Sequence, residues 1–210
     1  DTNAVPGAEG VSSGTLKVDA KGGVTMKASL ADNTSLTLKT AVSKNGALPV
    51  YGSLSKGLGT VVSWLMFDTN LPDTDVSGLL SWFKKTQPAS KIYPGGFTNE
   101  VMVVGSRFTA PTTNRVLNLT NAMIGFTNGN LAADFANDVT LGPDQRVTNN
   151  STNALTVKIQ KTSGLFTGSV TPPGGRAARS FKGALLQKQN RGAGFLLGTN
   201  RTSQVTLEEP

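Results

Sequence analysis

The chain contains no cysteine and no histidine. The absence of cysteine excludes a disulfide scaffold, thiol catalysis and a thiolate-bound metal. The absence of histidine removes the commonest general base and the usual zinc ligand. Glutamate occurs only at positions 9, 100, 208 and 209. A glycosidase needs two carboxylates on opposite sides of the scissile bond, and nothing in the sequence marks Asp134, Asp138 or Glu100 as such a pair. We therefore expect a protein that is not an enzyme, with no catalytic residues and no cofactor.

Charged residues and long hydrophobic runs are also scarce. Charged residues make up 16% of the chain, below the usual quarter, which argues against long solvated helices. No apolar run approaches the roughly 20 residues of a transmembrane helix, so no such helix is expected. No signal peptide is visible and Asp1 is not an initiator residue. We expect a mature product or an excised fragment.

What the chain does contain is an alternation of apolar and polar residues that is almost unbroken from residue 14 to 38. Leu16 and Val18 alternate with Lys17 and Asp19, and the pattern returns near the C-terminus. A period of two is typical of strands with one buried face, and the 24 glycines suit the turns between short strands. The pattern predicts an all-β fold, an antiparallel meander β-barrel or a tightly packed β-sandwich. A closed barrel removes the exposed edges that many short strands create.

One domain is expected behind a loose arm. Residues 1–13 are predicted to be a linker or loose N-terminal arm, and residues 14–208 a single β-barrel-like domain. Residues 26–30 resemble residues 166–170, which suggests two related halves, 14–98 and 150–208; chance similarity between Gly/Ser-rich strands is the alternative. Asn128-Gly129 suits a tight type I′ hairpin. Strands are predicted at 14–20, 23–30, 34–42, 47–54, 58–67, 76–83, 101–109, 115–119, 122–127, 130–135, 138–142, 145–148, 155–159, 164–170, 179–187, 192–199 and 203–208.

The segments FKGALLQKQN at 181–190 and GAGFLLGT at 192–199 carry a family resemblance. They are similar to the C-terminal β module of large secreted or surface proteins of Verrucomicrobia and related bacteria. The resemblance implies a secreted or cell-surface module that follows upstream β repeats of the same polypeptide. It brings no established catalytic residues, so none are transferred to this chain.

A polar loop between predicted strands is a candidate calcium site. Calcium takes six to eight oxygen ligands from flexible loops, and Asp68, Asn70, Asp73 and Asp75 could supply several. The spacing is not that of an EF-hand, which needs its glycine and a distal glutamate. The alternative is an ordinary turn between two strands.

Aromatic residues near the irregular segment 84–98 are a candidate sugar-binding surface. Trp82, Tyr93 and Phe97 could stack on sugar faces while Lys84 and Lys85 fix the orientation of the ligand. The alternative is core packing, because an aromatic residue in a strand is usually an interior anchor. For Trp64, which lies between Val62 and Met66, we predict a core position.

Positive charge is concentrated in the second half of the chain. The net charge is +7, and every arginine lies beyond residue 106. A block without acidic residues could meet an anionic polysaccharide or another cell-envelope component. A solvated sheet edge kept soluble by its charge is the alternative. The block consists of Arg176, Arg179, Lys182, Lys188, Arg191 and Arg201.

These observations predict a non-enzymatic extracellular module with an attachment or structural role and a partner such as an anionic polysaccharide. Nucleic acid is not the expected partner. Two alternatives remain open. One is a lipocalin-like carrier with a barrel cavity lined by Trp64 and Met66. The other is a self-assembling viral coat or shell protein, which the basic second half and the loose arm allow.

Overall fold

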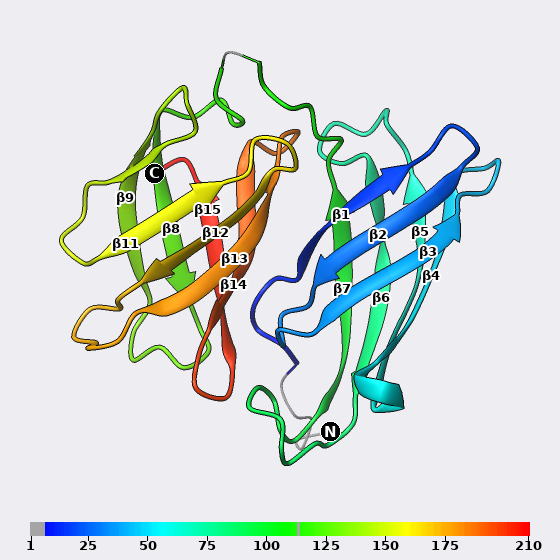
Figure 1. The fold of residues 1–210 in the computed structure, drawn as a ribbon, viewed down its shortest axis with the longest axis horizontal. Coiled ribbons are helices and arrows are strands. Elements are labelled where there is room, and N and C mark those ends of the chain that lie inside the picture. Colours follow the sequence, from blue (N-terminus) through cyan, green and yellow to red (C-terminus); the bar gives the residue numbers. More distant parts are fainter. Residues whose placement is uncertain (1–6, 113) are drawn as a thin grey trace.

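The computed structural model describes residues 7–112 and 114–210, which form fifteen antiparallel strands and one 3₁₀ turn, η1 (Ser55–Gly57). Figure 1 shows two lobes side by side. The N-lobe (residues 7–105) has a sheet of β1 (Ser13–Val18), β2 (Gly23–Ser29) and β3 (Ser35–Ala41), and a sheet of β4 (Ala47–Leu54), β5 (Gly59–Phe67), β6 (Val76–Lys84) and β7 (Phe97–Gly105). The C-lobe (residues 121–210) has β8 (Asn121–Thr127), β9 (Phe135–Leu141), β10 (Val147–Asn149), β11 (Leu155–Ile159), β12 (Leu165–Val170), β13 (Arg179–Leu186), β14 (Arg191–Leu197) and β15 (Thr202–Glu208).

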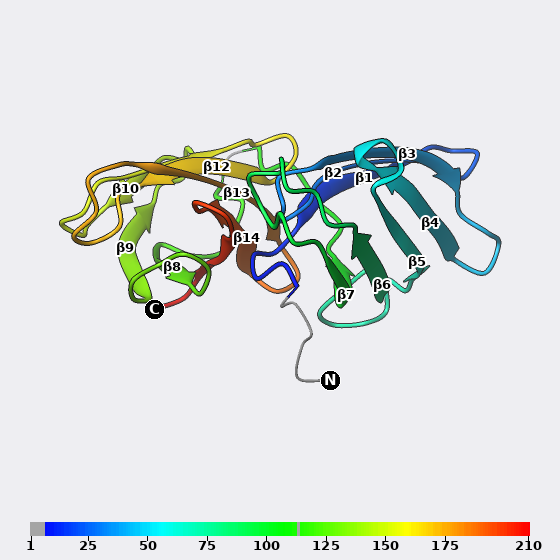
Figure 2. The ribbon, with the colours of Figure 1, turned by 90° about the horizontal axis from the view of Figure 1, so that it is seen from below.

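The two N-lobe sheets enclose a hydrophobic core, because each directs one set of alternating apolar side chains toward the other. Leu36 and Leu38 of β3 face inward, and Val61 and Leu65 of β5 are almost completely buried. The sheets meet where β3 runs beside β4 and diverge from that edge (Figure 2). The sequence predicted a core position for Trp64. This expectation is wrong, because Trp64 is 65% exposed on the outer face of β5.

The C-lobe is a single eight-stranded sheet that curls into a nearly closed barrel (Figure 2). The strand order is β10-β9-β8-β15-β14-β13-β12-β11, and one bridge, Arg146 to Lys158, joins the two edges. The predicted all-β barrel-like fold is confirmed. The order departs from a simple meander, because the last strand, β15, inserts between β8 and β14.

Phenylalanine rings fill the interior of this barrel. Phe126, Phe166 and Phe181 are buried, and the ring centroids of Phe126 and Phe181 lie 5.4 Å apart. Two glycines make room for the rings, because a Cβ on Gly183 would lie 2.3 Å from Phe166 Cζ, and one on Gly168 would lie 2.3 Å from Phe181 Cζ. The barrel is therefore a packed core. The cavity expected for a lipocalin-like carrier is not formed by Trp64 and Met66, which both point outward in the N-lobe.

The lobes share side chains across their boundary. Phe195 of β14 is fully buried in the N-lobe core. The hydroxyl of Tyr93 accepts hydrogen bonds from the backbone N–H groups of Glu9 (3.0 Å) and Thr202 (3.1 Å). The backbone N–H of Val11 donates to Gly194 O at 3.0 Å. These contacts join the chain before β1 and the segment before β7 to the C-lobe hairpin β14–β15.

Most predicted strands are present, but two are not. Residues 115–119 form no strand; their apolar side chains, including Val116 and Leu117, instead pack against the barrel core. Residues 130–134 belong to a loop, so the tight hairpin at Asn128-Gly129 is also wrong. Both residues have positive φ, but β9 begins only at Phe135, and Asp134 accepts the backbone N–H of Asn128.

Candidate functional site

The aromatic residues predicted to bind sugar lie in the N-lobe core. Trp82, Tyr93 and Phe97 are each at most 5% exposed. The Phe97 ring makes edge-to-face contacts with Trp82 and Tyr93, with centroids 4.7 and 5.3 Å apart. A ring must present an open face to stack on a sugar, so these three residues do not form the predicted binding surface. Their packing role is the alternative that the sequence left open.

The two lysines predicted beside those rings have separate roles. Lys84 is buried, and its ammonium lies 2.7 Å from Asp32 Oδ2 and 3.0 Å from Ile92 O. This ion pair joins the end of β6 to the turn between β2 and β3. Lys85 is exposed at the start of the following loop. A charge paired and buried in this way is unavailable to a ligand.

A lysine ammonium occupies the acidic loop that was predicted to bind calcium. Lys188, from the β13–β14 turn, donates to Thr69 O and Leu71 O and lies 2.9 Å from Asp75 Oδ1. The Asp68 carboxylate instead accepts a hydrogen bond from the backbone N–H of Asn70 within the loop, and the backbone carbonyl of Asp73 accepts one from the side-chain amide of Gln189. In the described part of the chain no three acidic side chains come together as a metal site. The loop is organised around an internal cation from the C-lobe.

Asp75 is the anionic partner in this arrangement. Burial acts to raise the pKa of its carboxyl, but the 2.6 Å hydrogen bond from the backbone N–H of Arg107 and the adjacent Lys188 ammonium outweigh it. The pKa of Asp75 is therefore lowered from the ordinary value of 3.8. The contact fixes the loop 68–75 against the β13–β14 turn, and its role is structural.

The predicted basic block does not form one surface. The β12–β13 loop, with Arg176, lies at one end of β13, and the β13–β14 turn, with Lys188 and Arg191, lies at the other. Arg179 donates to Asn130 O at 3.2 Å, and Arg201 lies 3.3 Å from Glu9. Arg191 donates to Gln189 at 2.7 Å. Of the block, Lys182 is the member placed at the middle of a strand.

Lys182 belongs to a different basic surface, which we call the lysine face. It is the outer face of strands β1–β3 and β11–β13, which lie side by side in one layer with β1 against β13 (Figures 1 and 2). None of the six strands contains an Asp or Glu. Their inward positions are largely apolar, so the period of two directs the lysines outward. The lysines of the face are Lys17, Lys27, Lys39, Lys158 and Lys182.

Hydroxyl side chains alternate with these lysines across the strands. In the N-lobe sheet, Thr25 pairs with both Lys17 and Lys39. In the C-lobe sheet, Thr167 pairs with both Lys158 and Lys182. The two sheets therefore present the same Lys-Thr-Lys row across three strands. Each ammonium has a hydroxyl on the neighbouring strand.

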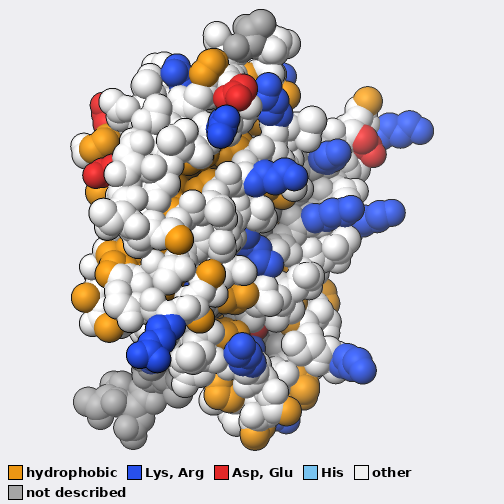
Figure 3. All heavy atoms as spheres, turned by 60° about the vertical axis from the view of Figure 1, so that its left-hand side comes forward, with side chains coloured by type: hydrophobic (Ala, Val, Ile, Leu, Met, Phe, Trp, Pro, Cys, Tyr) orange, Lys and Arg blue, Asp and Glu red, His pale blue; other side chains and the backbone are white. Residues whose placement is uncertain are grey.

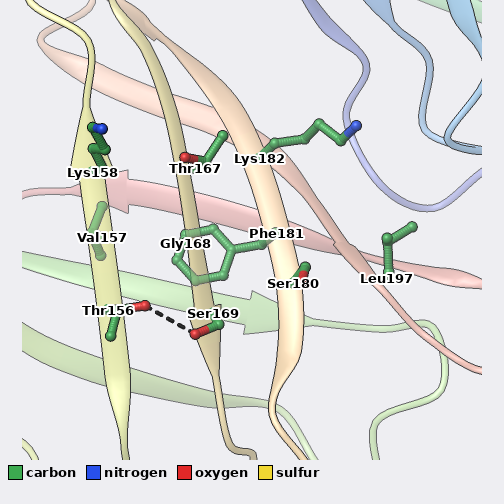
Figure 4. A pocket seen from close by; sticks show the side chains of 10 residues that line it. All are labelled: Thr156, Val157, Lys158, Thr167, Gly168, Ser169, Ser180, Phe181, Lys182 and Leu197. Carbon is green, nitrogen blue, oxygen red and sulfur yellow. Dashed lines mark hydrogen bonds between the residues drawn. The ribbon is translucent and has the colours of Figure 1, made fainter.

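A groove of about 510 Å³ runs along the C-lobe part of the lysine face (Figure 4). Lys158 and Lys182 lie on either side of Thr167, and a second row contains Thr156, Ser169 and Ser180. The hydroxyls of Thr156 and Ser169 share a hydrogen bond of 2.9 Å. Gly168 and Phe181 also line the groove between the two rows, and the Phe181 ring lies against Gly168 on the core side.

Charge on this side of the molecule is predominantly positive. Figure 3 shows many Lys and Arg side chains and few acidic ones on the face it presents. The Lys182 ammonium lies 5.4 Å from the centroid of the Phe195 ring, at the boundary of the two lobes. Ammonium groups bind carboxylate, sulfate and phosphate oxygens, and serine and threonine hydroxyls both donate and accept hydrogen bonds. The arrangement suits an extended anionic polymer that also carries hydroxyl groups.

No protein-family model, curated protein or solved structure matches the chain. Within residues 7–112 and 114–210, no helix is long and apolar enough to cross a membrane. The lysine face was missed at the level of sequence because its two halves lie more than a hundred residues apart. A signal was nevertheless present. Lys17, Lys27 and Lys39 all fall at polar positions of alternating strands that contain no acidic residue.

Proposed function

We propose that this protein is a non-enzymatic extracellular β module of a larger bacterial surface or secreted protein, and that it attaches to acidic polysaccharide through the lysine face. The observation that carries this proposal is the acid-free layer of six strands with five outward lysines between hydroxyl side chains. The extracellular setting rests on the resemblance of residues 181–199 to bacterial surface modules.

Acidic polysaccharide is favoured over nucleic acid by the composition of the face. Proteins that bind single strands stack bases on aromatic rings, and those that read double-stranded DNA contact base edges with arginine or lysine and with asparagine or glutamine. The side chains that form the lysine face are Lys, Thr and Ser, together with Leu165, Ala184 and Leu186 in the C-lobe, and no aromatic ring, arginine, asparagine or glutamine is among them. Such a surface supplies charge and hydroxyl hydrogen bonds, which match a polymer of sugar carboxylates or sulfates.

The test compares two variants that lose the same net charge. The face variant carries Lys17→Gln, Lys39→Gln, Lys158→Gln and Lys182→Gln. The control variant carries Lys44→Gln, Lys56→Gln, Lys85→Gln and Lys91→Gln, all at exposed loop or turn positions. Binding to polygalacturonate is measured by calorimetry at several salt concentrations, with dextran as the neutral polymer.

We expect the face variant to bind polygalacturonate at least about tenfold more weakly than the control variant, with a shallower dependence of log K on log salt. Dextran should bind to neither. The proposal fails if the natural protein does not bind polygalacturonate, or if both variants lose binding equally. Tighter binding to a DNA duplex of equal charge would replace the polysaccharide with nucleic acid.

A further inference from the structure

The outer face of the β4–β7 sheet is the most apolar exposed surface of the described residues. Of their exposed large hydrophobic side chains, all but Val18, Leu58 and Leu71 lie on it. Tyr51 is 69% exposed, and Trp64 and Met102 are each 65% exposed. We call this surface the apolar face. Its large members are Tyr51, Val62, Trp64, Met66, Leu79, Phe83, Met102 and Val104.

Strand register makes the apolar face continuous. Tyr51 of β4 pairs with Val62 of β5, and Leu79 of β6 pairs with Met102 of β7. Cross-strand pairs on one face of a sheet lie in direct contact range. Trp64 of β5 pairs with Pro49 of β4, and Met66 is the next outward residue of β5 after Trp64. The result is an apolar surface that crosses all four strands.

Charge is nearly absent from this face in a protein of net charge +7. Lys84 points into the core, where it pairs with Asp32. Glu100 is the one charged side chain that the four strands direct outward, and it accepts a hydrogen bond of 3.2 Å from Ser81. A polyanion has no cation to bind here. Two positively charged copies, in contrast, could meet at this face without bringing their lysines together.

The area of the apolar face matches a specific protein interface. From their exposed fractions, the eight large side chains expose roughly 900 Å², compared with about 800 Å² per partner in a standard interface. The largest apolar patch on a typical monomer is about 300–600 Å². Five of the eight large side chains are aliphatic or methionine, namely Val62, Met66, Leu79, Met102 and Val104, a composition that suits a protein contact better than a sugar-stacking platform.

We infer that the apolar face binds a second copy of this chain. An isologous pair related by a two-fold axis uses the same patch on both subunits and closes on itself. It would cover Trp64 and Met102 on both copies. The lysine face lies on the opposite side of the N-lobe core from β4–β7 and would stay open in the pair. The inference is independent of the proposed polysaccharide binding.

The test is the concentration dependence of mass, measured by sedimentation velocity and light scattering. The disrupting variant carries Trp64→Thr, Leu79→Thr and Met102→Lys; the side chains are exposed, and threonine is a good strand former. The matched control carries Val18→Thr, Leu58→Thr and Leu71→Thr, which are exposed apolar side chains outside the face. Circular dichroism confirms that both retain the β fold.

We expect the natural chain and the control to dimerise at micromolar concentrations and the disrupting variant to dimerise at least about tenfold more weakly. A natural chain that stays monomeric overturns the inference, as does a dimer that the disrupting variant leaves unchanged. Retention of a monomeric chain on cellulose that is lost with Trp64→Thr would overturn it in favour of a neutral-glycan surface. The lysine-face variant should dimerise normally, so failure of one proposal is distinguishable from failure of the other.

Discussion

Removal of the Lys84 ammonium should destabilise the protein far more than removal of any exposed charge. The Lys84 and Asp32 side chains are 6% and 2% exposed, and their charged atoms are 2.7 Å apart. At this distance and an effective dielectric constant of 20, the attraction is about 6 kcal/mol. Desolvation of the two ions offsets most of that attraction. The net contribution of the intact pair is therefore small, but the loss of one partner is not.

In Lys84→Met, the Asp32 carboxylate stays buried with one remaining hydrogen bond, from the backbone N–H of Thr34. We expect the free energy of unfolding to fall by about 3–5 kcal/mol, the usual loss when a buried pair is broken on one side. Urea denaturation followed by tryptophan fluorescence measures this loss. Lys85→Met, at the exposed neighbouring position, should change stability by less than about 0.5 kcal/mol.

The double variant Lys84→Met/Asp32→Asn separates charge burial from packing. The amide that replaces the Asp32 carboxylate carries no charge and can still accept the hydrogen bond from Thr34, so the double variant should recover most of the lost stability. The reasoning is refuted if the double variant is as unstable as Lys84→Met. It is also refuted if Lys84→Met and Lys85→Met unfold at the same urea concentration.

Three further outcomes follow from other contacts. The pKa of Asp75 in the folded protein is lowered, so the ionised carboxylate stabilises the fold above pH 3.8, and this stabilisation is lost as the pH falls from 3.8 through the folded pKa. Asp75→Asn should therefore make stability less dependent on pH over that range, as measured by acid unfolding followed by circular dichroism. Gly183→Val forces a side chain against Phe166, 2.3 Å from the added Cβ, and should lower the melting temperature through a loss of about 1–3 kcal/mol. Asn137 is fully buried and its amide donates hydrogen bonds to Asn149 and to Asn153, at 2.9 Å for the latter. Asn137→Leu should therefore lower the free energy of unfolding in urea by about 1–3 kcal/mol. An unchanged free energy of unfolding would contradict a structural role for this network.

Alternation of apolar and polar residues was sufficient to predict the fold class, because in a strand with one solvent-exposed face the pattern itself shows which side chains are buried. It fails for β5, where both faces are apolar. Ser63 points into the core and is 5% exposed, while its neighbour Trp64 is 65% exposed. Hydrophobicity favours the reverse assignment. Only the position of the opposing β1–β3 sheet, which is not encoded locally in β5, determines which side of this strand is covered.

The candidate sites illustrate the same limit. Lys182 and Lys188 are close in sequence but lie on different parts of the molecule, because an extended strand rises by about 3.3 Å per residue and so separates charges that are only a few positions apart. Lys17 and Lys182 are far apart in sequence, yet they share one layer because β1 contacts β13. The calcium prediction failed for a similar reason. The cation that occupies the loop 68–75 is Lys188, from a hairpin more than a hundred residues later.

The burial of Phe195 in the N-lobe core has a consequence for how the two lobes depend on each other. Residues 7–105 precede β14 in the chain, but their core lacks one large ring until β14 is in place. The N-lobe core is therefore completely packed only when β14 is folded against it, so the two lobes depend on the same hairpin. Cleavage that removes β14 and β15 would thus loosen the N-lobe as well as the C-lobe.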